Sequence, residues 1–369
     1  MSQEIKRDTN RPTGESFLSN DGIDYLEFAV RDVDRSRIVY DKMGFTAAGG
    51  RTTPDSHSLL FVQGDARIIL TASSNEAHPA FLFTRAHGDG VFDMAIRVDQ
   101  AERALAQAIK LGARAVLSPE TTFASAGSRA GGLQSRAAIH AFGDVRHSLI
   151  SYEKGAALVD FFPENSQAVT SHKGRFCQTI DHVTVNLPKG ELDRVAKFYS
   201  DVFGFSEVRY FDIRTAKSGL ISKAMRSANG RITMPFNEPT NDKSQIQEFL
   251  NTFHGPGVQH IALHVSSILL ALEEYEKQGL KFLTVPATYY EAVPERVPHV
   301  NETMADLQRH SILVDGTDKG YLLQIFSENL VGPLFYEFIQ RKGDNGFGEG
   351  NFRALFESIE RDQERRGVI

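Results

Sequence analysis

Three residues in the second half of the chain, His182, His260 and Glu337, have the types and the spacing of ligands for one metal ion. They are 78 and 77 residues apart, which indicates that three strands from equivalent places along one domain each supply a ligand. A carboxylate in an apolar strand is costly to bury unless it is paired or bound to metal. Two imidazoles and one carboxylate on one face leave the opposite positions open, as in non-haem Fe(II) oxygenases. The sequence therefore predicts one Fe(II) ion per subunit at these residues.

The elements that must position these ligands arise from a duplication. Residues 22–30, followed by a helical stretch that ends at Gly44, return as residues 179–187, followed by a helical stretch that ends at Gly204. Internal repeats fix the architecture and show which positions differ between the copies. Each copy reads as a strand that leads into a helix.

Two further pairs of segments extend the repeat. Residues 90–96 return as residues 257–263, 167 residues later. In a third match, residues 146–150 (RHSLI) pair with 309–313 (RHSIL), and residues 158–162 pair with 322–326. The order strand, helix, then several strands occurs twice in each half, so we expect an α+β fold. It has two domains, each of two βαβββ modules that form a curled open barrel.

The composition supports the following division of the chain. Residues 1–20 are expected to be a flexible tail, 21–166 a domain without metal, 167–178 a linker, and 179–369 the iron domain. After Gln340 the sequence becomes glycine-rich and then takes helical spacing, with Asn351 as a plausible N-cap. We expect a C-terminal helix over about 351–366. It either docks on the core as a structural element or acts as a lid hinged on the glycines.

The differences between the copies point to the site. Tyr25 stands where the second half has His182, and Asp93 stands where it has His260. One half alone thus has both imidazoles, which favours a site over independent structural histidines. His147 and His310, which match each other in the third pair of segments, are interpreted as structural.

Composition and charge exclude several classes of function. Acidic residues outnumber basic residues by 47 to 41, and the basic residues are scattered, which argues against nucleic acid as a partner. The single cysteine, Cys177, cannot form an intramolecular disulfide or a cysteine-rich zinc site. The polar N-terminus and the lack of a long apolar run predict no signal peptide and no membrane span. We expect a cytoplasmic protein that acts on a small molecule.

A set of short motifs in the second half carries a family resemblance. They are residues 180–183, 218–222, 235–239, 244–246, 257–262, 322–326, 335–341 and 346–352. With these motifs the C-terminal half resembles the bacterial 4-hydroxyphenylpyruvate dioxygenases, members of the vicinal-oxygen-chelate (glyoxalase/bleomycin-resistance-like) superfamily, and the N-terminal half resembles them more loosely. The resemblance implies an Fe(II) enzyme of tyrosine and phenylalanine catabolism that converts 4-hydroxyphenylpyruvate and O2 to homogentisate and CO2.

The resemblance also implies a substrate pocket around the iron. Its polar groups would be Ser222, Asn237, Gln245, Gln259 and Gln324, with Asn237 and Gln324 also acting in catalysis, and its aromatic walls would be Phe326, Phe347 and Phe352. Gln324 and Phe326 fall on one face of their strand by alternation. Gln259 adjoins His260, so a regular strand would send the two to opposite faces. Either a β-bulge lies there or Gln259 acts from the rim.

Three alternatives stay open at this point. Hydroxymandelate synthase shares substrate, iron and fold but oxygenates the benzylic carbon. An extradiol catechol dioxygenase shares the duplicated fold and the triad, and a binding module without metal shares only the fold. The resemblance further implies a homo-oligomer, with a tetramer expected and a dimer possible.

Overall fold

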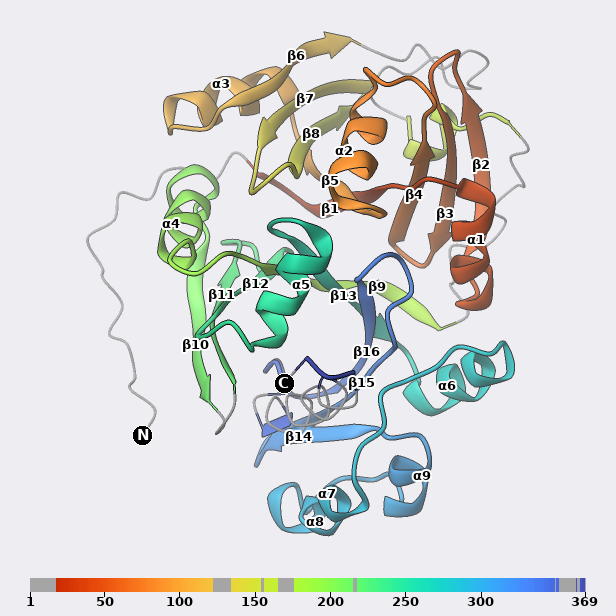
Figure 1. Cartoon of the computed structure of the whole chain (residues 1–369), viewed down its shortest axis with the longest axis vertical. Coiled ribbons are helices and arrows are strands. Elements are labelled where there is room, and N and C mark those ends of the chain that lie inside the picture. The colour runs from red at the N-terminus through yellow and green to blue at the C-terminus, as the bar shows by residue number, and fades with distance from the viewer. Residues whose placement is uncertain are drawn as a thin grey trace.

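Two eight-stranded mixed sheets, one in each half of the chain, form the body of the molecule (Figure 1). This statement covers the residues that the computed structural model describes, which are 18–121, 134–153, 156–164, 176–214, 218–348, 350–351, 363 and 366–368.

The N-terminal half forms one sheet. Its described elements are β1 (Leu18–Ala29), α1 (Val33–Lys42), β2 (Thr46–Thr52), β3 (His57–Gln63), β4 (Ala66–Ala72), α2 (Pro79–His87), β5 (Gly90–Val98), α3 (Ala101–Lys110), β6 (Ala115–Thr121), β7 (Gln134–His140), β8 (Arg146–Tyr152) and the 3-10 helix η1 (Leu158–Phe161). The strands join in the order β2-β3-β4-β1-β5-β8-β7-β6.

The C-terminal half repeats this order. Its described elements are β9 (Cys177–Asn186), α4 (Leu192–Phe203), β10 (Ser206–Arg214), β11 (Gly219–Arg226), β12 (Thr233–Pro239), α5 (Gln245–Phe253), β13 (Gly257–Val265), α6 (Ile268–Lys277), α7 (Ala287–Glu291), α8 (Val293–Arg296), α9 (Met304–Arg309), β14 (Leu313–Thr317), β15 (Gly320–Phe326) and β16 (Phe335–Lys342). The strands join in the order β10-β11-β12-β9-β13-β16-β15-β14.

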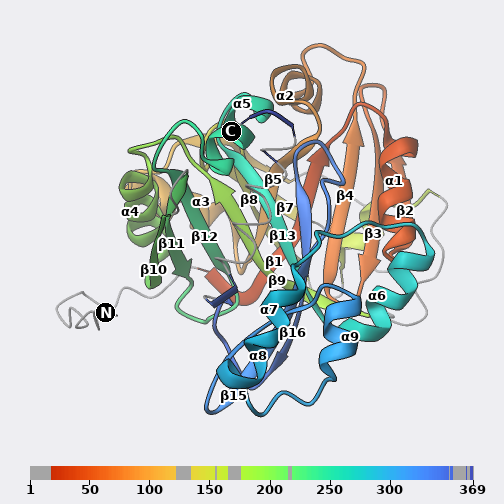
Figure 2. The same ribbon diagram turned by 60° about the horizontal axis from the view of Figure 1, so that its bottom comes forward.

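Each sheet consists of two βαβββ modules. The first and last strands of every module pair in parallel, as β1 does with β4 and β13 does with β16. The two modules of a half join through their first strands, which are antiparallel. Figure 2 shows how both sheets curl, with helices on their outer sides. The predicted duplicated α+β fold is confirmed.

One part of the predicted repeat is wrong. Residues 146–150 lie in β8, whereas residues 309–313 run from the end of α9 into β14. Residues 158–162 include η1, whereas 322–326 lie in β15. The counterpart of β8 is β16, because Asp93 pairs with Arg146 as His260 pairs with Phe335. Three identical residues within a five-residue match do not fix the place of a strand, whereas its pairing along the whole sheet does.

The helices follow from their sequences. In α4 the buried positions Leu192, Val195, Tyr199 and Val202 recur at helical spacing and turn one face to the core. The helix ends at Gly204, whose φ of 69° places it in the left-handed region that an L side chain rarely adopts. The predicted helix end is therefore confirmed.

Buried contacts join the two halves. The hydroxyls of Tyr40 on α1 and Tyr336 on β16 lie 3.0 Å apart, and His147 on β8 accepts a 2.6 Å hydrogen bond from the hydroxyl of Tyr199. The interpretation of His147 as structural is confirmed, since its other ring nitrogen bonds the carbonyl of Met94. His310 is also structural, because it is buried and pairs with Glu276 at 3.0 Å.

The predicted divisions of the chain lie partly outside the described residues. This applies to 1–17 of the tail, to 167–175 of the linker and to most of the C-terminal helix, including Phe352. β1 begins at Leu18 and β9 at Cys177, inside the ranges assigned to the tail and the linker. No helix in the described part of the chain is long and apolar enough to cross a membrane.

Candidate metal centre

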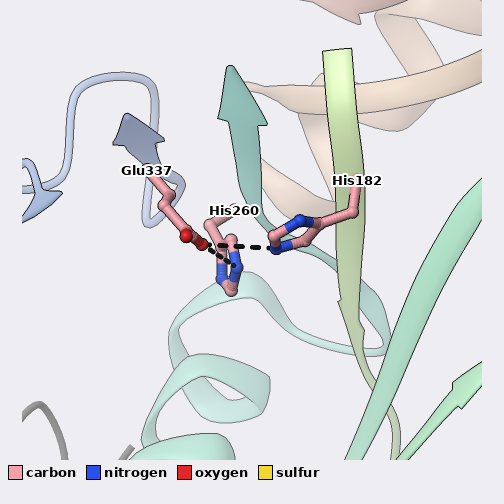
Figure 3. A group of neighbouring side chains, drawn as sticks. All are labelled: His182, His260 and Glu337. Atoms are coloured by element: carbon pink, nitrogen blue, oxygen red, sulfur yellow. Dashed lines mark ion pairs between the residues drawn. The ribbon is translucent and has the colours of Figure 1, made fainter. Parts of the chain in front are cut away.

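Three strands of the C-terminal sheet bring His182, His260 and Glu337 together (Figure 3). They come from β9, β13 and β16, which are neighbours in the sheet. One carboxylate oxygen of Glu337, Oε2, lies 3.2 Å from Nε2 of His182 and 3.4 Å from Nε2 of His260. All three side chains are buried.

The nearly equal sequence intervals between the three residues, 78 and 77, do not have the predicted cause. β9 and β13 open their modules, but β16 closes the second module, so Glu337 does not come from an equivalent place. It reaches the site because β16 pairs in parallel with β13, so that Glu337 lies opposite Ala262 of β13. On the other side of β13, His182 of β9 lies opposite the same alanine. Adjacent strands, rather than a third repeat, bring the ligands onto one face.

The donor set fits a first-row metal ion. Ligand atoms about 2.1 Å from one ion and at right angles to each other lie about 3 Å apart. The two separations from Glu337 are 3.2 and 3.4 Å, and all three candidate ligand atoms lie within 4.8 Å of one another. Two imidazoles and one carboxylate on one face match the ligand set that non-haem Fe(II) sites use.

Each candidate ligand is held from behind by a second side chain. Nδ1 of His182 bonds Asp181 at 2.9 Å, and Nδ1 of His260 bonds the amide oxygen of Gln259 at 3.0 Å. The amide of Gln324 donates to Oε1 of Glu337 at 3.0 Å. These partners leave both Nε2 atoms and Oε2 facing the common point, which is the arrangement that orients metal ligands.

β-bulges let neighbouring residues act together here. The register between β13 and β9 shifts between Val258 and His260, so of the two alternatives left open for Gln259 the β-bulge is the one present. A second shift, between Ala262 and Leu263, leaves Asp181 unpaired opposite them. Each bulge turns a residue that would face away in a regular strand toward its histidine neighbour.

The electrostatics favour a charged carboxylate beside a cationic or metal-bound imidazole. Burial raises the pKa of Glu337, but His182 and His260 outweigh it and bring the value to about 2. Burial lowers the pKa of His182, yet Glu337 and Asp181 raise it to about 9. For His260, burial prevails and lowers the pKa. A metal ion needs neutral imidazoles, so it would take the place of the proton on His182.

A cavity opens beside the triad. Six of the predicted pocket residues line it: Ser222, Asn237, Gln245, Gln259, Phe326 and Phe347. Gln324 does not, because it lies behind Glu337 and also accepts a 2.9 Å hydrogen bond from Asn351. Phe352 lies outside the described residues. The cavity has a volume of only about 60 Å³. Phe347, which lines it, packs edge-on against His182 with ring centres 5.8 Å apart.

Four residues at the site were missed from the sequence. Phe335 stacks on His260 with ring centres 4.9 Å apart, and Thr184 lines the cavity with a buried hydroxyl that has no hydrogen-bond partner among the described residues. Arg341 donates to both oxygens of Asp181 at 2.7 and 2.8 Å, and also to the carbonyl of Gly346 at 2.7 Å. One side chain thus links the outer partner of His182 to the segment that carries Phe347. The sequence signal was that Asp181, Phe335 and Arg341 lie within the family motifs, whereas Thr184 lies outside them.

Family models match both halves of the chain. Residues 15–126 match the model described as hydroxyphenylpyruvate dioxygenase, N-terminal. Residues 179–293 match that of the glyoxalase/bleomycin resistance protein/dioxygenase superfamily.

Whole proteins are similar over nearly the full length. The 4-hydroxyphenylpyruvate dioxygenase of Legionella pneumophila (strain Corby) is 40% identical over 95% of this chain and 96% of its own. That of Pseudomonas sp. (strain P.J. 874) is 40% identical over 94% and 96%. Among solved structures, a mutant of 4-hydroxymandelate synthase from Streptomyces coelicolor is 30% identical, with a TM-score of 0.81 over 93% of this chain and 98% of that one. The chain belongs to the 4-hydroxyphenylpyruvate dioxygenase family.

Proposed function

We propose that this chain is an Fe(II)-dependent dioxygenase that converts 4-hydroxyphenylpyruvate and O2 to homogentisate and CO2, with one iron per subunit on His182, His260 and Glu337. The observation that carries the proposal is the buried triad, open on one side to a cavity lined by amides and aromatic rings. The substrate is inferred from the family to which the chain belongs. When bound, the iron supplies open positions for the 2-oxo acid and for O2, and it carries the oxidation.

The protein's first task is to hold the three ligands still. Asp181 and Gln259 fix the tautomers of the two histidines, and Gln324 holds Oε1 of Glu337 so that Oε2 faces the ion. Because outer partners of this kind set both the direction and the basicity of a ligand, they keep the site ready for binding.

The second task is to orient the substrate. Ser222 and Asn237 face each other across β11 and β12, and Gln245 opens α5 at the cavity. Neutral amides and hydroxyls suit a phenol and a keto group without competing for the iron. The free hydroxyl of Thr184 adds a further polar contact. Held in this way, the ring would lie beside the metal in one pose, which is what selects the atom that is oxygenated.

The third task is to admit the substrate and then exclude water. Pockets that hold ligands of this size have volumes of roughly 300 Å³ or more, whereas the cavity here measures about 60 Å³. The segment with Phe347 must therefore move for binding. Gly348, with φ of 70°, lies beside the amide of Gln324 and leaves no room for a side chain there. We propose that Phe347, whose ring packs against His182, takes part in closing the site over the bound substrate, whereas Phe352, expected to join it, lies outside the described residues.

The proposal is tested by adding 4-hydroxyphenylpyruvate to the purified, Fe(II)-loaded protein, recording O2 uptake and identifying the product by chromatography. Homogentisate, with one CO2 released per O2 consumed, is the expected result. Hydroxymandelate would keep the triad and overturn the assignment of the pocket. No O2 uptake from protein with iron bound would overturn the proposed activity itself.

The cellular setting belongs to the same proposal. We infer that the enzyme works in the cytoplasm as a homo-oligomer, with a tetramer expected. Light scattering on the purified protein measures the assembly directly, and a monomer at micromolar concentration would contradict that part of the proposal.

A further inference from the structure

The N-terminal half contains a second cavity at the place that corresponds to the metal centre. Tyr25 pairs with Ala95 as His182 pairs with Ala262, and Asp93 pairs with Glu27 as His260 pairs with Thr184. The register of β5 with β8 places Ser148 where β16 has Glu337. The three ligand positions are thus Tyr25, Asp93 and Ser148. Around them lies a cavity of about 410 Å³.

This cavity is not a second metal site. Asp93 is fully buried, and its two oxygens accept four hydrogen bonds, from Arg136 at 2.8 Å, Arg146 at 2.8 Å, and the backbone and hydroxyl of Ser148 at 3.0 and 2.6 Å. Two guanidinium groups next to the carboxylate repel any added cation. Asp93 instead serves as the anchor that holds both arginines on the cavity wall.

The arginines present unused donors to the cavity. A guanidinium has five N–H groups in a planar fork. Among the described residues, Arg136 bonds only Asp93 and Ser148, and Arg146 bonds only Asp93, with Glu27 4.0 Å away. Arg136 occupies the position of Gln324, since it pairs with Ile150 as Gln324 pairs with Ile339. A cationic fork therefore replaces the neutral amide of the other half.

Other charged groups line the wall beside these two arginines. Arg51 of β2 also lines the cavity, and burial, followed by the neighbouring Arg136, lowers its pKa. The acidic groups that face the cavity are Glu27, which accepts a 2.6 Å hydrogen bond from Thr71, and Asp55, which accepts one at 2.8 Å from Asn75. With Asp93 included, three guanidiniums stand against three carboxylates, so the preference for an anion rests on the N–H groups that Arg136 and Arg146 have left over and not on a net charge. The N-terminal end of α2, at His78 and Pro79, adds a further preference for an anion.

The remaining walls are apolar and largely aromatic. Phe92, Tyr25 and Ile69 come from the sheet, and Leu158 and Phe162 close the open end. Arg146 lies over the ring of Phe92 at 4.9 Å, so the cationic and aromatic surfaces meet. The closing segment is fixed to β2, because Gly50 and Glu164 exchange two backbone hydrogen bonds of 2.6 and 3.0 Å. An aromatic body and an anionic head fit these walls together.

We propose that the N-terminal cavity is a binding site for a small aromatic carboxylate, with Arg51, Arg136 and Arg146 around the carboxylate and Phe92, Tyr25 and Phe162 around the ring. A volume of about 410 Å³ admits a molecule of that size. The inference rests on the N-terminal half alone and does not depend on the proposed function of the metal centre.

The test uses the full chain, stripped of metal with a chelator, and isothermal titration calorimetry. The probe is 4-hydroxyphenylacetate, with the neutral 4-hydroxyphenylacetamide and inorganic phosphate as matched comparisons. A crystal grown with the probe then shows where it binds. We expect saturable binding of the carboxylate in the N-terminal cavity, and binding at least about tenfold weaker for the amide and for phosphate, because each lacks one half of the recognised ligand.

Variants place the binding on the named residues. Arg51→Ala leaves the anchor at Asp93 intact, so the variant is expected to fold. It should lower the affinity for 4-hydroxyphenylacetate at least about tenfold. Arg103→Ala, at an exposed arginine on α3, is the matched control and should change nothing. Because the chain has no tryptophan, Leu158→Trp gives a second readout, an emission change on binding that Arg51→Ala should remove.

Several results would overturn the proposal. These are no binding by either readout, equal affinity in wild type and Arg51→Ala, and probe density elsewhere than the N-terminal cavity. If the amide bound as tightly as 4-hydroxyphenylacetate, the arginines would not be what recognises the ligand. If phosphate bound as tightly, the aromatic wall would not contribute to binding.

Discussion

At the positions where the C-terminal half carries His182, His260 and Glu337, the N-terminal half carries Tyr25, Asp93 and Ser148. Both halves have the same strand order and the same bulge in the first pair of strands, at Gln259 and at Phe92. The backbone alone therefore does not make a metal centre. Three side chains on a shared scaffold distinguish the half that has the candidate metal ligands from the half that lacks them.

The fate of the buried carboxylate shows the difference most clearly. Glu337 is held by one neutral amide, Gln324, which leaves Oε2 to the two imidazoles. Asp93 accepts hydrogen bonds from Arg136 and Arg146 at Oδ2 and from the backbone N–H of Ser148 at Oδ1, so both of its oxygens are occupied. A buried acid becomes a candidate metal ligand where its neighbours are neutral, and a structural ion pair where they are cationic.

The largest effect is expected when the C-terminal half receives the N-terminal residue. Glu337→Ser removes the carboxylate ligand and leaves two histidines. Loss of an outer partner typically costs ~10–100-fold, so loss of a ligand should lower kcat at least about a thousandfold. Iron per chain by elemental analysis and O2 uptake check this. Ser148→Ala is the matched control and should keep both values within about twofold. Retained iron and activity in Glu337→Ser would break the comparison.

The role of Asp93 in the N-terminal half is tested by measuring the free energy of unfolding. Asp93→Ala leaves Arg136 and Arg146 buried without their partner, which should cost about 3 kcal/mol of unfolding free energy. Urea denaturation measures the loss. Asp41→Ala, which breaks an exposed pair with Arg37, serves as the control and should cost less than about 1 kcal/mol. Equal costs for the two would mean that Asp93 is not the anchor described here.

The outer partners give a smaller effect that sharpens the comparison. Gln259→Leu removes the acceptor of the His260 Nδ1 proton and should weaken iron binding ~10–100-fold. Competition with a fluorescent chelator measures the affinity. Phe92→Leu, at the corresponding bulge of the N-terminal half, should leave the affinity for iron unchanged. An affinity that stays constant in Gln259→Leu would show that the amide does not position the histidine.

The smallest effect concerns the contact between the halves. Burial lowers the pKa of His147 to about 4, against about 6.5 in an unfolded chain. The unfolded state therefore takes up the proton first, so the stability is complete above about pH 6.5 and falls as the pH drops toward 4. At about pH 5.5 the loss is about 1.4 kcal/mol.

His147→Gln should remove this part of the pH dependence. Urea denaturation at about pH 7.5 and pH 5.5, on wild type and variant, gives the difference. An identical pH dependence in the two proteins would contradict the assignment of a neutral imidazole at the contact with Tyr199.

Much of this architecture could be predicted from the sequence, because repeats and strand alternation are local patterns. The modules and the helix end at Gly204 follow from residue types along short segments, whereas the bulge at Gln259 was one of two alternatives that only the strand register decides. The meeting of His182, His260 and Glu337 was predicted as well, although the reason given for Glu337 was wrong. Its strand closes a module and gains its place through parallel pairing with β13.

Contacts between distant segments could not be predicted. Arg341 meets Asp181 across 160 residues, and Phe335 stacks on His260 only because β16 lies beside β13. The position of Gln324 behind Glu337, rather than on the cavity wall, depends on the three-dimensional packing around Asn351. The N-terminal cavity left no local signal either, since its arginines come from separate strands.

The most direct test of the difference between the halves is anomalous scattering at the iron edge from crystals loaded with Fe(II) without oxygen. We expect one peak per chain, between His182, His260 and Glu337, and none between Tyr25, Asp93 and Ser148. A peak in the N-terminal half, or none at the triad in protein that contains iron, would contradict the claim that these three side chains confine the metal chemistry to one half.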